Sequence, residues 1–156
     1  MAGKKKERRN GKQSSFVRPA IKDDCGFIRK LSSEVFSIFG DYSDIIPQWF
    51  SNPDVMTVIC VNSGHPVGFS MLFAPSGEIL AVAVTPRYQR SGIGSALLKH
   101  IEGLAGQFGL SKLSLHTAKE NHIAQLFFQK AGFEASATQE DYYPKGQTAL
   151  IMSRGI

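Results

Sequence analysis

The part of the sequence that decides the fold is Val82-Ala83-Val84-Thr85-Pro86-Arg87-Tyr88-Gln89-Arg90-Ser91-Gly92-Ile93-Gly94-Ser95-Ala96-Leu97-Leu98. Its apolar start predicts a buried strand that ends at Pro86, and the pattern from residue 91 to about residue 108 predicts a helix. Between them lies a turn of polar residues. Gly92 and Gly94 carry no Cβ, so they allow the backbone to approach a ligand closely.

The start of this predicted helix is suited to an anion. The first turn of a helix leaves its N–H groups unpaired, and the helix dipole places positive charge there. Together with Arg87 and Arg90, these donors favour a pyrophosphate. The same glycines are also compatible with close helix–sheet packing and no ligand. The segment is not a Walker A loop, because no Gly-Lys-Ser/Thr follows, and Glu102 is too near for a Rossmann motif, whose third glycine is also missing.

The chain on either side alternates between strand and helix patterns. Toward the N-terminus we expect a strand at residues 16–18, a helix that Asp23 or Asp24 caps and that Gly40 ends, and a short helix or helical loop within residues 41–52. Strands are expected at residues 55–61, 66–73 and 78–85. After the quoted segment we expect strands at residues 113–117, 133–139 and 147–152, with a helix at residues 121–131. This order predicts an α/β (α+β) protein with a mixed central sheet of about seven strands flanked by about four helices.

Length and charge indicate one domain with a basic leader. The 156 residues can bury a sizeable core. Residues 1–12 hold six basic side chains and one acidic one, whereas the remaining 12 basic and 12 acidic residues cancel. We therefore predict a disordered basic leader at residues 1–14 and a neutral domain at residues 15–156. The leader can touch nucleic acid or act as a targeting signal, but nucleic acid is not expected as the main partner.

Compartment and metal content follow from what the sequence contains. Its apolar stretches are far shorter than the roughly 20 residues that span a membrane. The basic N-terminus is not followed by the apolar region of a secretory signal. Cys25 and Cys60 lie far apart without metal-ligand spacing. We expect a cytoplasmic protein with two free thiols, no membrane partner and no metal.

Three blocks of the sequence resemble the GNAT acetyltransferases. Residues 84–94 are similar to the family's acetyl-CoA pyrophosphate loop, Gln/Arg-x-x-Gly-x-Gly/Ala. Residues 121–133 resemble its Asn-x-x-Ala-x-x-Phe-Tyr-x-Lys-x-Gly-Phe block, and residues 141–144 with 149–152 resemble the end of ribosomal-protein and protein N-terminal acetyltransferases. The resemblance covers roughly residues 16–154.

The resemblance implies a GNAT fold in which strand 78–85 splays from strand 111–117 and acetyl-CoA, the co-substrate, lies in the gap. Backbone groups of Val82 and Val84 would pair with the pantetheine, and the amides of residues 90–95 would hold the pyrophosphate. Asn121 would contact the cofactor, although a plain helix N-cap is the alternative. The implied cofactor-binding residues are Val82, Ala83, Val84, Gln89, Arg90, Ser91, Gly92, Ile93, Gly94, Ser95, Asn121 and Phe128.

Two residues are candidates for the catalytic base. An amine must be neutral to attack a thioester, which costs roughly 4–5 kcal/mol at pH 7 for lysine and about 1 kcal/mol for a protein α-amine. Glu78 resembles the base of the histone-acetylating branch, and His116 occupies the position where N-terminal acetyltransferases place a histidine or glutamate base. An exposed strand-end carboxylate and a structural histidine are the alternatives, so the base stays open between them.

The acceptor and the proton donor are less determined. Many family members have a tyrosine at the position of Phe128, where it acts as general acid. Phenylalanine cannot donate a proton, so solvent, Tyr142 or Tyr143 would protonate the thiolate here. Phe128 can also be a plain core residue. Trp49, Tyr142 and Tyr143 are expected to line the acceptor site. We predict an N-acetyltransferase acting on a primary amine, with a protein N-terminal α-amine favoured. A lysine or small-molecule amine acetyltransferase and a non-catalytic acetyl-CoA-binding module remain alternatives, and a homodimer is a further expectation.

Overall fold

The computed structural model describes residues 14–156, so the predicted basic leader lies outside the described residues except for residue 14. The described chain forms one seven-stranded sheet in the order β1-β2-β3-β4-β5-β7-β6. Only β4 and β5 run parallel, and the other neighbouring strands are antiparallel. The strands are β1 Phe16–Pro19, β2 Val55–Asn62, β3 His65–Phe73, β4 Glu78–Val84, β5 Lys112–Ala118, β6 Glu134–Gln139 and β7 Ala149–Gly155.

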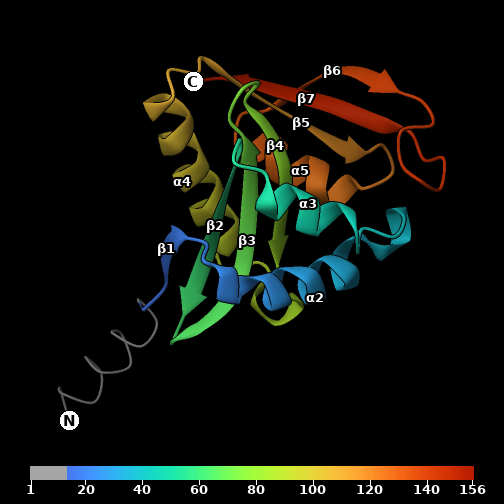
Figure 1. Ribbon diagram of the computed structural model, residues 1–156. Coiled ribbons are helices and arrows are strands. Elements are labelled where there is room, and N and C mark those ends of the chain that lie inside the picture. The colour runs from blue at the N-terminus through green and yellow to red at the C-terminus, as the bar shows by residue number, and fades with distance from the viewer. Residues whose placement is uncertain (1–13) are drawn as a thin grey trace, which may run out of the picture.

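Within residues 14–156, four α-helices cover the sheet, two on each face (Figure 1). They are α2 Cys25–Phe36, α3 Ile45–Ser51, α4 Ile93–Gln107 and α5 His122–Lys130, with short 3₁₀ turns η1 Lys22–Asp24, η2 Ser37–Phe39 and η3 Pro86–Tyr88. Buried side chains of α4 and α5 pack on one face, and those of α2 and α3 pack on the other. The predicted mixed sheet with about seven strands and four helices is therefore confirmed.

The start of α2 differs from the expected cap. Asp24 directly precedes the helix, but its carboxylate accepts two hydrogen bonds from Arg18, at 2.8 and 3.0 Å, and one from the Ile21 N–H at 2.8 Å. The Arg18 guanidinium lowers the pKa of Asp24. The carboxylate therefore ties β1 to the start of α2 instead of capping it. The helix ends at residue 36, and η2 continues the chain to Gly40.

Parallel pairing of β4 and β5 is confined to two residue pairs, Glu78 with Ser114 and Ile79 with Leu115. Beyond Ile79 the two strands part, which confirms the predicted splay. On its other side β4 stays paired with β3 as far as Val84. The sheet is therefore open in its middle on one side of β4.

No helix within residues 14–156 is long and apolar enough to cross a membrane. In the same part of the chain, no group of three or more His, Cys, Asp or Glu side chains could hold a metal ion.

Candidate active site

Backbone groups of β4 line the opening between β4 and β5. The Thr85 N–H donates to the Val67 carbonyl of β3 at 2.8 Å. Because the bonding direction alternates along a strand, Val82 and Val84 then turn their backbone groups toward the opening. This is the arrangement predicted for a pantetheine. The Val84 carbonyl accepts a hydrogen bond from Gln89 Nε2 at 3.1 Å, so Gln89 closes one end of the opening.

The turn from β4 into α4 has the backbone that the glycine pattern predicts. Arg90 and Gly92 both have positive φ, 64° and 86°. A Cβ added at Gly92 would meet no atom within 4 Å, so the space beside Gly92 is open. The Ala96 N–H is bonded to the Gly92 carbonyl, at 3.0 Å. The amides of Ile93, Gly94 and Ser95 precede the first such bond and belong to the helix turn that lacks intrahelical acceptors. Ser91 Oγ donates to the Tyr88 carbonyl, which braces the turn.

Gly94 has a different role from Gly92. A Cβ added at Gly94 would lie 3.2 Å from two ring atoms of Phe127. The absence of a side chain at Gly94 therefore lets α4 approach α5, and the role of Gly94 in binding the pyrophosphate stays a prediction. Its backbone amide still belongs to the first turn.

Three predicted cofactor residues make contacts within the protein itself. The Asn121 side chain caps α5 by accepting a hydrogen bond from the Ala124 N–H at 3.2 Å. A helix N-cap was the alternative to cofactor contact for this residue. Phe128 is 9% exposed and packs edge-on against Phe127 and Phe133, with ring centroids 5.0 and 5.7 Å away. Ala83 is buried, and by the alternation along β4 its backbone faces β3. The side chains of Ala83 and Phe128 are therefore buried in the core and do not line the opening between β4 and β5.

Glu78 and His116 meet where β4 and β5 begin to part. Glu78 pairs with Ser114, and His116 lies two residues further along β5 on the same face of that strand. His116 Nδ1 and Glu78 Oε2 are 3.0 Å apart. The side chains are 22% and 28% exposed, so both remain accessible. The structure thus joins the two candidate bases into one hydrogen-bonded pair.

Aromatic side chains surround this pair. The Tyr142 ring is stacked on His116, with centroids 4.2 Å apart and planes inclined by 5°. Tyr143 meets Tyr142 edge-on at 4.9 Å, and Tyr42 lies 6.4 Å from Trp49. Burial raises the pKa of Tyr142, and the nearby Glu78 and Tyr42 raise it further. Tyr142 therefore stays a neutral phenol at neutral pH.

Tyr42 was not among the predicted site residues. It lies between η2 and α3, its ring contacts Trp49, and its charge interaction raises the pKa of both Tyr142 and Tyr143. No sequence signal marks it, because a tyrosine in a loop between two helices has no motif around it.

Two segments distant in sequence close one side of the aromatic cluster. One is residues 37–44, between α2 and α3, and the other is residues 140–148, between β6 and β7. Lys145 Nζ donates to the Ser37 carbonyl at 3.1 Å, and Gln147 Nε2 donates to the Ile38 carbonyl at 2.8 Å. Phe39 and Tyr143 have ring centroids 5.0 Å apart. These contacts hold the tyrosines in place.

Gly40 is the point of closest approach between these two segments. A Cβ at Gly40 would lie 2.6 Å from two side-chain carbons of Pro144, and its φ is 145°. We expect Gly40→Ala to lower the free energy of unfolding by about 1–3 kcal/mol and to raise the acceptor KM, because Pro144 must move. Urea unfolding and steady-state kinetics measure both effects.

The matched control is Gly26→Ala in α2, where an added Cβ meets nothing within 4 Å. Alanine suits a helix better than glycine, so this variant should lose no stability. Equal behaviour of the two variants would contradict the contact with Pro144.

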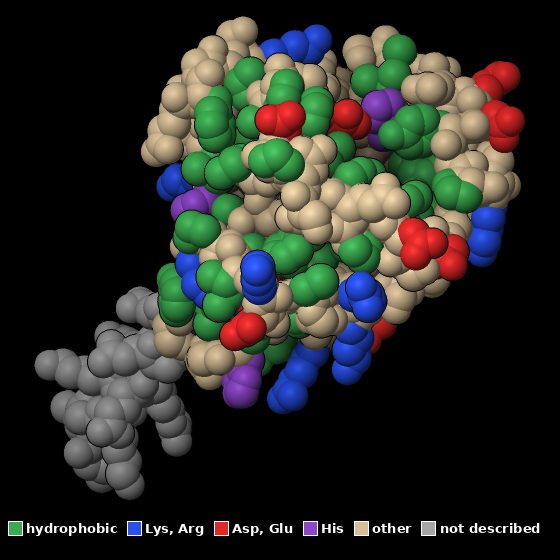
Figure 2. Space-filling model, viewed as in Figure 1, with side chains coloured by type: hydrophobic (Ala, Val, Ile, Leu, Met, Phe, Trp, Pro, Cys, Tyr) green, Lys and Arg blue, Asp and Glu red, His purple; other side chains and the backbone are tan. Residues whose placement is uncertain are grey.

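The face that carries α2 and α3 is rich in hydrophobic side chains, and Lys and Arg side chains gather along its lower edge (Figure 2). That edge lies near α2 and the turn from β4 to α4 (Figure 1).

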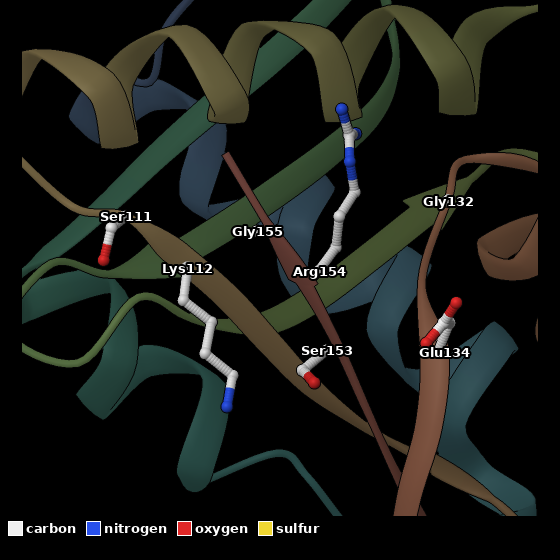
Figure 3. Close-up of a pocket in the computed structure, with 7 residues that line it drawn as sticks. All are labelled: Ser111, Lys112, Gly132, Glu134, Ser153, Arg154 and Gly155. Carbon is white, nitrogen blue, oxygen red and sulfur yellow. The ribbon is translucent and has the colours of Figure 1, made fainter.

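A separate pocket lies at the start of β5 and the end of β7 (Figure 3). It holds none of the predicted site residues, and its Arg154, which points toward α4, is already paired with Glu102.

The mixed sheet that opens beside a glycine turn is the fold of solved N-acetyltransferase structures. The chain belongs to the acetyltransferase (GNAT) family, whose model matches residues 26–133.

Known relatives agree with this placement. The chain is 35% identical over 78 residues to [Ribosomal protein bS18]-alanine N-acetyltransferase of Escherichia coli K12. This match covers 48% of the chain and 53% of that protein, so the chain spans about half the length of the curated relative. The crystal structure of the Escherichia coli ribosomal-protein-S18-alanine N-acetyltransferase has a TM-score of 0.79 at 22% identity, covering 91% of this chain and 94% of that one.

Two further solved structures share the fold. Ard1 from Thermoplasma volcanium has a TM-score of 0.82 at 22% identity and covers 92% of this chain and 98% of its own. An aminoglycoside 6'-N-acetyltransferase complexed with coenzyme A has a TM-score of 0.75 at 15% identity, with 90% and 96% covered.

Proposed function

We propose that this chain transfers the acetyl group of acetyl-CoA to a primary amine, and that the acceptor is a peptide α-amine. The observation that carries the proposal is the Glu78–His116 pair at the opening between β4 and β5. A proton acceptor stands at the start of β4, the strand that leads into a turn suited to an anion. Family membership supports acetyl-CoA as the acetyl donor.

The donor is held by backbone more than by side chains. The free first turn of α4 and the positive end of its dipole suit the pyrophosphate. The exposed backbone groups of Val82 and Val84 can pair with the pantetheine amides as an added strand does. Since Gly92 leaves open space, a phosphate can approach the turn closely. The thioester then lies toward Glu78 and His116.

The reaction forms one bond and breaks one. The amine nitrogen attacks the thioester carbon, the new C–N bond forms, and the C–S bond breaks with its electron pair leaving on sulfur. The Glu78–His116 pair accepts the proton that the amine loses, and the thiolate takes up a proton to give free coenzyme A. Phe128 cannot donate that proton, because its side chain has no ionisable group. Solvent water can supply that proton, so no side-chain donor is required.

A peptide α-amine is favoured over lysine on two grounds. Deprotonating an α-amine at pH 7 costs about 1 kcal/mol, against roughly 4–5 kcal/mol for a lysine side chain. The aromatic walls formed by Trp49, Tyr142 and Tyr143, together with Tyr42, suit the backbone and first side chains of a peptide. A relative whose name states that it acetylates an alanine of a ribosomal protein points the same way.

The proposal is tested by release of free thiol from acetyl-CoA. The acceptors are a peptide with a free N-terminal alanine, the same peptide acetylated at its N-terminus and carrying one internal lysine, and a polyamine. We expect turnover with the first, and at least roughly ten-fold lower kcat/KM with the others, in line with the cost of lysine deprotonation. Preference for the lysine peptide or the polyamine would overturn the acceptor class. Binding of acetyl-CoA without turnover on any amine would instead support a non-catalytic acetyl-CoA-binding module.

A further inference from the structure

Tyr142 has a contact that binding an acceptor does not require. Its ring lies flat on the His116 imidazole, at 4.2 Å and 5°. Side chains that only line a substrate site need not stack on the base. The stacked ring therefore restricts rotation of the imidazole about its Cβ–Cγ bond, which would break the hydrogen bond with Glu78.

The contact with Glu78 determines which nitrogen of His116 can accept a proton. A carboxylate can only accept hydrogen bonds, so Nδ1, 3.0 Å from Glu78 Oε2, must carry the hydrogen in the neutral ring. Nε2 is then the nitrogen with a free lone pair. This hydrogen bond engages Oε2 of Glu78, and the pair presents Nε2 of His116 as its free nitrogen base.

Both neighbours also favour the charge that forms during the reaction. When the imidazole takes a proton it becomes a cation, which a facing aromatic ring and a neighbouring carboxylate both stabilise. These interactions are stronger after proton transfer than before it, which is the kind of interaction that accelerates the chemical step.

The Tyr142 backbone is fixed independently of any acceptor. Its N–H donates to the Gln147 carbonyl at 3.1 Å, and the Gln147 side chain donates to the Ile38 carbonyl. The ring is therefore held over His116 by the contact between residues 37–44 and residues 140–148. If Tyr142 were displaced, the His116 imidazole would no longer be held in its hydrogen bond with Glu78.

We propose that Tyr142 and Glu78 are positioning residues for His116: the stacked ring and the carboxylate hold the imidazole as the Nδ1–H tautomer, with Nε2 as the proton acceptor. This rests on the proposed function for its catalytic consequence. The tautomer itself is a property of the resting protein and can be measured without any acceptor.

The first measurement is ¹⁵N NMR of full-length protein labelled at histidine, with the His116 signals identified from a His116→Gln sample. We expect His116 of the wild type and of Tyr142→Phe to show the Nδ1–H tautomer. Tyr142→Leu and Glu78→Gln should show a mixture of the two tautomers. A wild-type ring that carries its hydrogen on Nε2 would overturn the proposal even if the enzyme turns over.

The second measurement is kinetic. We expect Tyr142→Leu to lower kcat by roughly 10- to 100-fold, the penalty of a misplaced catalytic group, with the acetyl-CoA KM little changed. Tyr142→Phe retains the ring and should restore kcat to within about three-fold. Phe108→Leu, which removes an exposed ring at the end of α4, is the control for loss of an aromatic. Melting temperatures confirm that each variant is folded.

The two proposals fail in different ways. If Tyr142→Leu keeps the wild-type tautomer and kcat, or if Tyr142→Phe loses as much activity as Tyr142→Leu, the positioning role of the ring is wrong while the acetyltransferase stands. If no amine is acetylated but the tautomers behave as expected, the proposed function fails and the positioning of His116 remains.

Discussion

Replacing His116 with alanine should lower kcat by roughly 10²–10⁴ at pH 7, the range expected for loss of a general base. The amine would then have to lose its proton to water. Raising the pH should restore part of the rate, because more of the acceptor is neutral and hydroxide can replace the base. The measurement is kcat and KM for the variant and the wild type across the pH range.

Two further variants make the result decisive. His65→Ala removes an exposed imidazole at the start of β3 and controls for loss of a histidine. Glu78→Gln should be milder than His116→Ala if Glu78 positions the base, and more severe if Glu78 is itself the base. Rates within a few-fold of the wild type for both His116→Ala and Glu78→Gln would show that the pair is not catalytic and that the non-catalytic module is the better reading.

Gly92→Asp should abolish measurable acetyl-CoA binding, a loss of at least about 100-fold or roughly 2.7 kcal/mol. Two effects act together. The residue has a φ of 86°, which a side chain adopts at a cost of roughly 1–2 kcal/mol. The new carboxylate would also stand at the first turn of α4, where it would compete with and repel a pyrophosphate. Isothermal titration calorimetry measures the affinity directly.

Gly109→Asp is the matched control for Gly92→Asp. Gly109 also has positive φ, 75°, with nothing within 4 Å of an added Cβ, but it follows the other end of α4. The backbone strain and the added charge are therefore similar, and only the place differs. Retained affinity in Gly109→Asp with lost affinity in Gly92→Asp supports the phosphate site. Unchanged binding in a folded Gly92→Asp protein would remove the donor assignment.

Sequence patterns predicted the fold well because they reflect local rules. The β-branched runs, the hairpin turn before His65 and the helix that starts after Gly92 each depend on residues close together in the chain. The family resemblance predicted that β4 splays from β5. Their pairing is confined to two residue pairs, which confirms the prediction.

Individual side chains were harder to place because their roles depend on neighbours far along the chain. Asn121 caps α5 through the Ala124 N–H, and its contact with the cofactor stays a prediction. The ring of Phe127, on another helix, occupies the space beside Gly94, and no local pattern around Gly94 predicts that contact. Phe128 is apolar and near a functional block, yet its position against Phe133 makes it core.

The sequence by itself determined the order of strands and helices along the chain, the glycine turn into α4 and the residue types that can move a proton, since each follows from local pattern and chemistry. Only the tertiary structure decided that Glu78, His116 and Tyr142 meet. They lie on β4, on β5 and in the segment before β7, and no local rule links positions that far apart. The physical reason is that a strand pair which closes for two residues and then opens brings the first two together, while the contact between residues 37–44 and residues 140–148 lays the third over them.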